Sequence, residues 1–181
     1  MGYPLREQVP GAYYHVGTRG NNQRDIYVDD RSRLIFYLQL QVIARRYGWQ
    51  ILAYCLMINH YHLVMRIGPD GLSRGMQGLN SSYAHAFNAQ YGRGDHLFGR
   101  RFWSRELEDA DDLLRTCVYV DLNPTRSFDV AAFDWRWSSH RAAIGLDGPA
   151  GFHHVDKLWT LIDRRPRSAM DAYAELCRSS L

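Results

Sequence analysis

Residues 58–65 read Ile-Asn-His-Tyr-His-Leu-Val-Met, a His-x-His pair inside an apolar run. In an extended strand, alternate side chains leave the same face, so His60 and His62 point together while Tyr61 and Leu63 point to the other face. Two neighbouring imidazoles can hold one metal ion. A chain with eight histidines contains such a pair by chance about one time in three. The pair therefore becomes evidence for a metal site only in combination with other sequence features.

The same stretch predicts a β-hairpin. Residues 49–57 are expected to form a buried strand, residues 58–59 the turn, and residues 60–67 the second strand. Residues 12–18, rich in aromatic and β-branched side chains, predict an earlier strand. Residues 96–107 predict a fourth strand, which carries several arginines.

Three helices alternate with these strands. The first begins at Asp29 or Asp30 and stops at Gly48. The second ends near Tyr91, and the third begins after residue 109 and is ended by Pro124. The expected buried rows are Leu34, Leu38 and Val42 in the first helix, Met76, Leu79, Tyr83 and Phe87 in the second, and Leu114, Val118 and Leu122 in the third.

The predicted order is strand, helix, strand, strand, helix, strand, helix, and its first six elements are those of a ferredoxin-like split βαβ unit. We predict an α+β fold in which a four-stranded antiparallel sheet carries its helices on one face. This domain is expected over residues 9–128. Residues 129–181 are expected to form a C-terminal helical extension that begins with a short helix after residue 135.

Charge is distributed unevenly along the chain. All but one of its 22 Lys and Arg residues are arginines. Residues 1–105 carry 13 arginines against 6 acidic residues, a surplus of +7, whereas residues 106–181 carry 9 basic and 13 acidic residues, a surplus of −4. Arginine suits phosphate binding and stacking on bases. Two interpretations stay open: nucleic-acid binding by the N-terminal part, or the arginine codons of a GC-rich genome.

Several classes of protein are disfavoured. The cysteines Cys55, Cys117 and Cys177 lie far apart, which argues against a disulfide framework or a cysteine zinc site. The longest apolar run, residues 51–58, is far shorter than the roughly 20 residues of a membrane span. Neither a P-loop nor a signal peptide is recognised. We expect a cytoplasmic protein that needs no membrane and no nucleotide cofactor.

Some other side chains could serve either the core or a site. His15 is expected to be a hydrogen-bonded core residue, and the adjacent His153 and His154 are expected on the surface. Of Phe102 and Trp103, one is expected to pack into the core while the other could stack on bases.

Six short motifs occur in an ordered series along residues 9–145, and a series is far more specific than any one motif. They are Tyr14-His15-Val16, Thr18-Arg19-Gly20-Asn21, Ala53-Tyr54-Cys55-Leu56-Met57, Asn59-His60-Tyr61-His62-Leu63-Val64, Tyr119-Val120-Asp121-Leu122-Asn123-Pro124 and Trp137-Ser138-Ser139. This series resembles the REP-associated tyrosine transposases, a branch of the single-tyrosine HUH transposases of insertion sequences. The family fold is the ferredoxin-like one predicted above.

The resemblance implies cleavage and joining of single-stranded DNA at hairpin sites. His60 and His62 match the pair that binds a divalent metal ion. Tyr119 matches the nucleophile, and Asn123 matches an amide metal ligand on the same helix. The residues predicted to contact DNA are Arg19, Asn21, Arg100 and Arg101.

Elementary chemistry supports these roles. The charge of a phosphodiester must be neutralised before an oxygen nucleophile approaches, and a metal on His60 and His62 would do this. A phosphotyrosine link keeps the energy of the broken bond, so a 3′-hydroxyl can reverse the step without ATP. Helical spacing places Tyr119 and Asn123 on one face, one turn apart. Two imidazoles and an amide oxygen suit Mn²⁺ or Mg²⁺.

Three functions remain open. The first is a metal-dependent single-strand endonuclease and strand transferase that uses Tyr119. The second is a domesticated relative that binds structured single-stranded nucleic acid and no longer cuts. The third is a small metallohydrolase in which His60 and His62 activate water, with Tyr119 only a helix-edge core residue. The presence of all three side chains favours the first. We expect a monomer.

Overall fold

Four antiparallel strands form one sheet in the order β2-β3-β1-β4. They are β1 (Tyr13–Arg19), β2 (Gln50–Leu56), β3 (His60–Arg66) and β4 (Trp103–Leu107). The structure is a computed structural model that describes residues 8–181. Residues 96–102, expected to be the first part of β4, run as a loop apart from an isolated bridge at Phe98.

Three long helices alternate with the strands as predicted: α1 (Asp30–Tyr47), α2 (Ser73–Tyr91) and α3 (Ala110–Asp121). Shorter elements follow, namely α4 (Asn123–Phe128), α5 (His140–Ala143), α6 (Val155–Ile162) and α7 (Pro166–Ser179), with 3₁₀ turns η1 (Asn21–Gln23) and η2 (Ala132–Asp134). The predicted order and the helical C-terminal extension are confirmed. Within residues 8–181, no helix is both long and apolar enough to span a bilayer.

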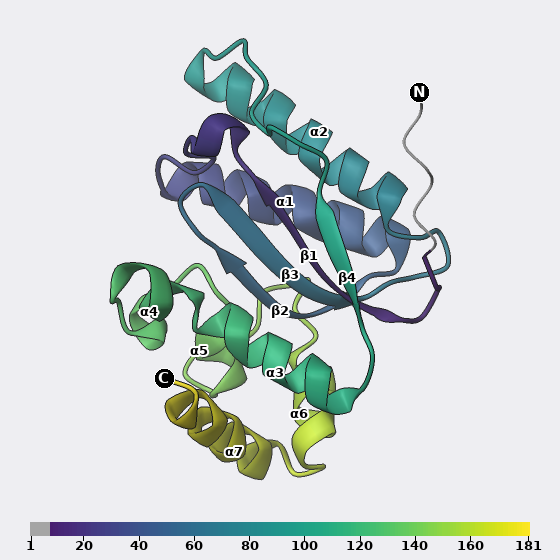
Figure 1. Cartoon of the computed structure of the whole chain (residues 1–181), viewed down its shortest axis with the longest axis vertical. Coiled ribbons are helices and arrows are strands. Elements are labelled where there is room, and N and C mark those ends of the chain that lie inside the picture. The colour runs from purple at the N-terminus through teal and green to yellow at the C-terminus, as the bar shows by residue number, and fades with distance from the viewer. Residues whose placement is uncertain (1–7) are drawn as a thin grey trace.

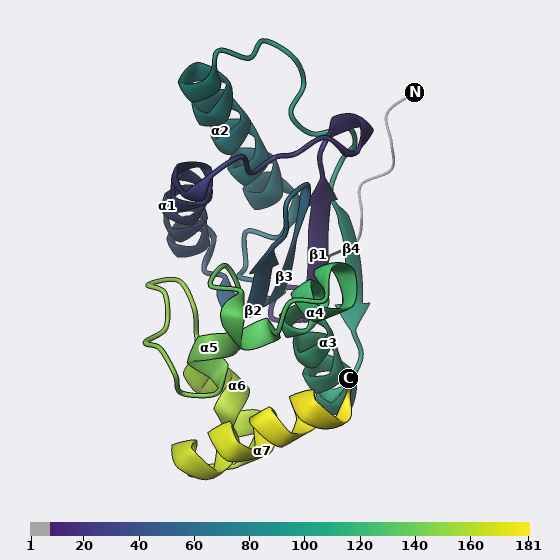
Figure 2. The same ribbon diagram turned by 90° about the vertical axis from the view of Figure 1, so that its left-hand side faces the viewer.

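The two faces of the sheet carry different helices (Figures 1 and 2). Tyr61, Leu63 and Met65 of β3 pack in one core with α1 and α2. Val64 faces the opposite side and packs in a second core with α3 and the C-terminal helices. The prediction of helices on one face is therefore right for α1 and α2 and wrong for α3. Both α1 and α2 cross between parallel strands, which fixes their side, whereas α3 leads to no further strand.

Helix α1 has the predicted ends but a different buried side. The Asp29 side chain caps it by accepting from the Ser32 backbone N–H, and Gly48 ends it in the left-handed conformation. The predicted row of Leu34, Leu38 and Val42 is 52–63% exposed. The buried residues are instead Phe36, Leu40, Ile43 and Ala44. Both rows have helical spacing, and the one that contains an aromatic ring packs against the aromatic core.

The end of α3 also differs from expectation. Leu113 and Cys117 lie at the centre of its buried face, and Leu114 is only half-buried. The helix ends at Asp121, and Pro124 lies in the first turn of α4 rather than terminating α3. Proline fits this position because the first turn of a helix has N–H groups without helical partners.

The C-terminal extension completes the edge of β2. Backbone and side chain of Ser139 both bond to Tyr54, at 2.9 and 2.8 Å, and the Leu56 N–H donates to the Trp137 carbonyl at 2.9 Å. The Trp137-Ser138-Ser139 motif thus covers an edge strand. Ser139 and Tyr173 also donate to the buried Asp121 carboxyl, at 2.5 and 2.9 Å. The predicted boundary at residue 128 stays a prediction, since the second core includes residues from both sides of it.

His153 lies in the core, which corrects the expected surface position. Its Nε2 atom bonds to the Leu52 carbonyl at 2.9 Å, and residue 153 forms a bridge with Ile51. Burial lowers the pKa of His153 to about 4. The partner of this histidine is about 100 residues away in the sequence, so local pattern could not reveal its burial.

Replacing His153 with glutamine is expected to weaken the acid sensitivity of the fold. The pKa of His153 is about 4 in the folded state and about 6.5 in the unfolded chain. The unfolded state therefore binds more protons between these values, and stability from this residue is lost as the pH falls through them. Chemical denaturation between about pH 7 and pH 5 should show a shallower loss of unfolding free energy in His153→Gln than in the natural protein. Identical pH dependence would contradict the prediction, and His85→Gln, at an exposed position on α2, is the control.

Candidate active site

The pairing of β1 with β3 assembles the His face of the sheet. Gly17 lies opposite His62 and Arg19 lies opposite His60. Because side chains alternate along a strand, His15 projects to the same face as these residues. The ring centroids of His60 and His62 are 5.1 Å apart. The predicted histidine pair is therefore formed, with a third histidine beside it.

A hydrogen bond orients the His60 ring. The Nδ1 atom of His60 lies 2.7 Å from Oδ1 of Asn59. The Asn59 amide is itself fixed, since its Nδ2 donates to the Gln23 carbonyl at 2.9 Å. An amide oxygen can only accept, so Nδ1 of His60 carries the proton and Nε2 keeps its lone pair. This is the tautomer that ligation of a metal through Nε2 requires.

His15 orients the second ring. Its Nε2 atom lies 3.1 Å from Nδ1 of His62, and both side chains are buried. When Nδ1 of His62 donates this bond, Nε2 of His62 also keeps its lone pair. His15 was expected to be a hydrogen-bonded core residue. The hydrogen bond is present, but the partner is a site histidine, so His15 belongs to the site.

All three imidazoles are neutral at physiological pH. Burial lowers the pKa of His15 and of His60 to about 4, and that of His62 to about 3. The Arg19 charge lowers the pKa of His60 further, and the Arg105 charge does the same for His15. For His62, the other two histidines and Arg19 lower the pKa further. A neutral imidazole is the form that can ligate a metal.

Trp103 forms a wall beside the histidines. Its ring lies edge-on to His15 at 4.6 Å and is 5.7 Å from His62. It can lie there because Gly17 has no side chain, as a Cβ atom on Gly17 would be 2.6 Å from the indole. The neighbouring Phe102 is buried, whereas Trp103 is 41% exposed. The expected division between one core aromatic and one available for stacking is confirmed.

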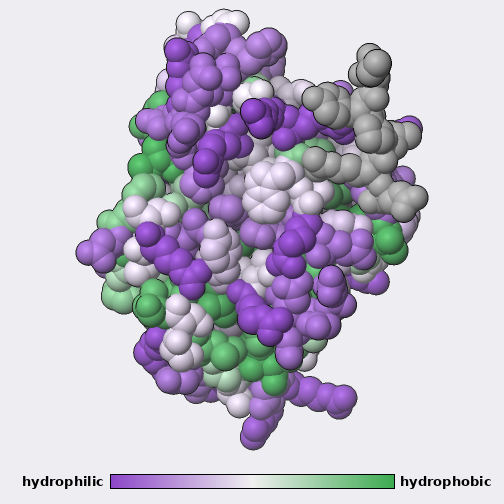
Figure 3. All heavy atoms as spheres, viewed as in Figure 1, coloured by the Kyte–Doolittle hydropathy of each residue, from purple (hydrophilic) through white to green (hydrophobic). Residues whose placement is uncertain are grey.

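A cavity of about 890 Å³ opens over His60 and His62. It will be called the His cavity. Its lining includes every residue predicted to contact DNA, namely Arg19, Asn21, Arg100 and Arg101. Figure 3 shows one face of the molecule, on which hydrophilic side chains predominate and hydrophobic ones lie in the lower part and along the left edge. Among residues 8–181, no cluster of three or more His, Cys, Asp or Glu side chains suits a metal.

Helix α3 brings Tyr119 to the same face. The Tyr119 ring centroid is 6.0 Å from that of His62, and the side chain is 42% exposed. Arg105 of β4 fixes the helix by donating to both Asp112 carboxylate oxygens, at 2.7 and 3.1 Å, and to Thr116 at 3.0 Å. The sequence-predicted nucleophile and histidine pair therefore lie side by side, although 57 residues separate Tyr119 from His62 in the sequence.

Asn123 is buried one turn beyond Tyr119. Its Nδ2 atom donates to the Tyr119 carbonyl at 3.4 Å. The amide oxygen Oδ1 is thus the atom of this side chain that could ligate a metal. Helical spacing predicted the proximity of the two residues, although Asn123 opens α4 instead of closing α3.

Known proteins resemble the chain in sequence and in fold. Residues 8–121 match the sequence profile of the family described as transposase IS200 like. The chain belongs to the IS200-like transposase family. No functionally curated protein matches it.

Solved structures with a similar fold include a REP-associated tyrosine transposase bound to a REP hairpin. It is 19% identical, has a TM-score of 0.68, and the match covers 86% of this chain and 90% of that chain. This likeness confirms the predicted fold. A putative transposase from Deinococcus radiodurans is 15% identical with a TM-score of 0.46, over 64% of this chain and 92% of that chain.

Sequence reasoning missed one residue beside Tyr119 of this IS200-like transposase. The Arg126 guanidinium lies 5.3 Å from the centre of the Tyr119 ring, and Arg126 also donates to the Ser180 carbonyl at 3.1 Å. A cation over a phenol ring is attracted by its π electrons. Tyr119 and Arg126 are seven residues apart, about two turns of a helix, and on one continuous helix this spacing predicts proximity. The break between α3 and α4 made that prediction unavailable from the sequence.

Nitrogen NMR of the imidazoles should reveal the neutral state and the tautomer. We expect His60 to titrate near pH 4 and His62 near pH 3, with the proton of His60 on Nδ1 above these values. Titration of either ring between about pH 6 and 7, or a proton on Nε2 of His60, would contradict the account of the site.

Proposed function

We propose that this IS200-like transposase is a metal-dependent single-stranded DNA endonuclease and strand transferase that acts at hairpin sites through a 5′-phosphotyrosine intermediate. The observation that carries the proposal is the distance of 6.0 Å between the rings of Tyr119 and His62. A phosphate between them would meet a nucleophile on one side and metal-binding imidazoles on the other.

The charges around the site support a nucleic-acid substrate. Among residues 8–181, Arg74 and Arg100 form no salt bridge. Other arginines pair with acids, as Arg105 does with Asp112 beside the site and Arg141 with Asp147 in the C-terminal part. The charges of Arg74 and Arg100 are therefore available to a phosphate backbone. The similar REP-associated transposase is bound to a REP hairpin, which supports a hairpin as the partner.

The donors present fit a divalent ion such as Mg²⁺ or Mn²⁺. Nε2 of His60, Nε2 of His62 and Oδ1 of Asn123 would hold it, with the substrate phosphate as a further ligand. A bound ion would withdraw electron density from the scissile phosphate and stabilise charge on the leaving oxygen. Asn59 and His15 would orient the two imidazoles.

The reaction follows from the positions of the remaining groups. Oη of Tyr119 attacks the scissile phosphorus, the Oη–P bond forms, and the bond from phosphorus to the 3′ oxygen breaks. The phenol gives up a proton and the 3′ oxygen gains one, so a 3′-hydroxyl leaves. In strand transfer, a 3′-hydroxyl attacks the phosphotyrosine and Tyr119 regains its proton. Arg126, over the phenol ring, stabilises the negative charge that the phenol oxygen carries during each step.

Replacing Tyr119 with phenylalanine is expected to abolish cleavage. Hairpin oligonucleotides with single-stranded flanks would be incubated with the protein and Mn²⁺ or Mg²⁺, and a denaturing gel would measure the covalent protein–DNA product. Loss of the nucleophile should lower product formation by at least about 10³-fold. Tyr47→Phe, at the end of α1, is the matched control and should retain activity.

The same gel separates the alternatives. Metal-dependent cleavage that survives in Tyr119→Phe would replace the tyrosine mechanism with that of a metallohydrolase. Binding of hairpins without cleavage under any metal would identify a binding protein that no longer cuts. The monomeric state expected from the sequence stays a prediction.

Asn59→Ala is expected to weaken metal binding about 10- to 100-fold, the usual effect of removing a partner that orients a metal-ligating histidine. Calorimetric titration with Mn²⁺ would measure this without depending on DNA cleavage. Asn59→Asp keeps an acceptor for Nδ1 of His60 and should bind Mn²⁺ nearly as well as the natural protein. Equal weakening in both variants would instead assign the effect to the lost bond with Gln23.

A further inference from the structure

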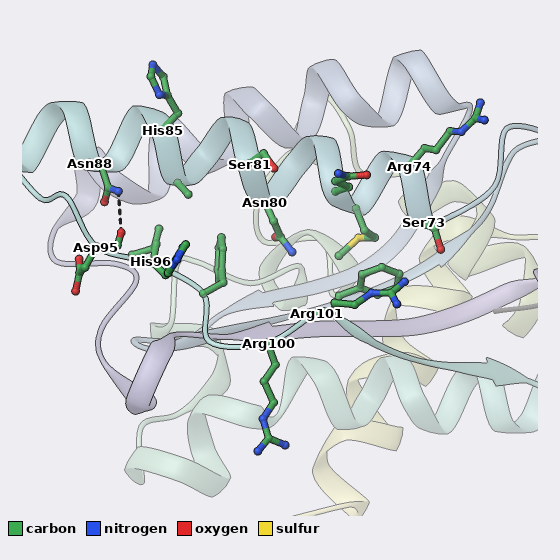
Figure 4. A pocket seen from close by; sticks show the side chains of 16 residues that line it. Ser73, Arg74, Asn80, Ser81, His85, Asn88, Asp95, His96, Arg100 and Arg101 are labelled. Atoms are coloured by element: carbon green, nitrogen blue, oxygen red, sulfur yellow. Dashed lines mark hydrogen bonds between the residues drawn. The ribbon is translucent and has the colours of Figure 1, made fainter. Parts of the chain in front are cut away.

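A second hollow lies beside the His cavity, between α2 and residues 95–102 (Figure 4). It will be called the α2 groove. Its volume is about 850 Å³. The lining extends along α2 from Ser73 to Asn88, a length of about 22 Å at 1.5 Å per residue. The functions assigned to Tyr119 and the histidine pair do not use this groove.

The groove combines an apolar floor with polar walls. The floor includes Met76, Phe98 and Phe102, of which Phe98 is partly exposed. Gln77 and Ser81 are exposed on the α2 wall. An accessible apolar ring, here that of Phe98, below hydrogen-bonding side chains is what an unstacked nucleobase requires.

Asn80 ties the groove to the sheet. It accepts from the Tyr61 hydroxyl at 2.5 Å and its Nδ2 donates to Thr18 at 3.2 Å. Tyr61 lies on β3 between His60 and His62. The position of the α2 wall is therefore fixed relative to the histidine pair, so one strand of DNA could contact both places in a defined register.

The charge of the groove suits a phosphate backbone. Arg74 lines it, and Arg100 and Arg101 line both the groove and the His cavity. In Figure 4 the Arg100 side chain extends away from α2. Among the described lining residues, the one acidic side chain is Asp95, which pairs with Arg24 at 2.9 Å and Arg93 at 3.4 Å. A backbone leaving the His cavity past these arginines would enter a positively charged groove.

We propose that the α2 groove is a second DNA-binding site, which takes unpaired bases of the strand that runs into the His cavity. The proposal rests on the proposed function, since it gives the same substrate a second point of contact. Single-stranded DNA is preferred over the duplex stem because bases in a duplex are stacked and cannot reach the floor rings. The affinity for DNA then depends on the single-stranded segment next to the hairpin.

The test fills the groove. Ser81→Trp and, as a second variant, Gln77→Trp would place an indole in it, whereas Ala89→Trp would place one on an exposed part of the same helix outside the lining. Fluorescence polarisation would measure binding of a hairpin with a single-stranded flank, the same hairpin without it, and an unstructured oligothymidine. Thermal unfolding would verify that each variant is folded.

We expect the natural protein and Ala89→Trp to bind the flanked hairpin at least about tenfold more tightly than the blunt one, an effect that one base–aromatic contact can produce. The groove-filling variants should lose this difference and also bind oligothymidine about tenfold more weakly. A retained flank effect in both folded variants would overturn the proposal, as would equal binding of flanked and blunt hairpins by the natural protein.

The proposed function can fail separately. If no hairpin is cleaved but the filled groove still weakens binding of oligothymidine, the groove is a DNA site and the cleavage proposal is wrong. If cleavage occurs while the groove variants bind every DNA as the natural protein does, the groove proposal is wrong and the catalytic one stands. A 2-aminopurine base in the flank, whose fluorescence changes on stacking, would identify the position that enters the groove.

Discussion

The antiparallel register between β1 and β3 is the constraint on which the site depends. It places Gly17 opposite His62 and Arg19 opposite His60, so two histidines, an arginine and the gap that admits Trp103 share one face. A shift of one residue would turn His60 and His62 into the core and bring Tyr61 and Leu63 to the surface. Tyr61 and Leu63 are fully buried against α1 and α2. Their burial therefore disfavours such a shift and keeps His60 and His62 on the face of the site.

Tyr119, the proposed nucleophile, is held in place by a different set of contacts. Helix α3 packs its buried side in the second core, and the Arg105–Asp112 pair ties its first turns to β4. At its other end, Asp121 accepts hydrogen bonds from Ser139 and Tyr173 of the C-terminal extension. Burial raises the pKa of Asp121 to about 7. The extension thus supports the helix that carries Tyr119, although the family match ends at residue 121.

Local signals in the sequence were sufficient for the order of elements and for the placement of His60 and His62 on one face of β3. Alternation predicted the two faces of β3, and the cap at Asp29 and the stop at Gly48 gave the ends of α1. The buried side of α1 was wrong because both of its apolar rows have helical spacing. The face of α3 was wrong because crossover rules place only helices that connect strands of the sheet.

Long-range contacts explain what the sequence left undecided in the site. His15 reaches His62 across two paired strands, and Arg126 reaches Tyr119 across the break between two helices. Neither contact follows from spacing alone. The α2 groove also arises from segments that are distant in the sequence, so its lining could not be recognised from any single motif.

Mass spectrometry of the trapped protein–DNA product tests the central claim most directly. Trypsin would release residues 116–126, a peptide in which Tyr119 is the only tyrosine. After nuclease digestion, the account predicts that this peptide carries a nucleotide through its 5′ phosphate, and that fragmentation assigns the added mass to Tyr119. A nucleotide on another residue, or DNA cleaved to a free 5′ phosphate with the peptide unmodified, would contradict the claim that Tyr119 is the nucleophile.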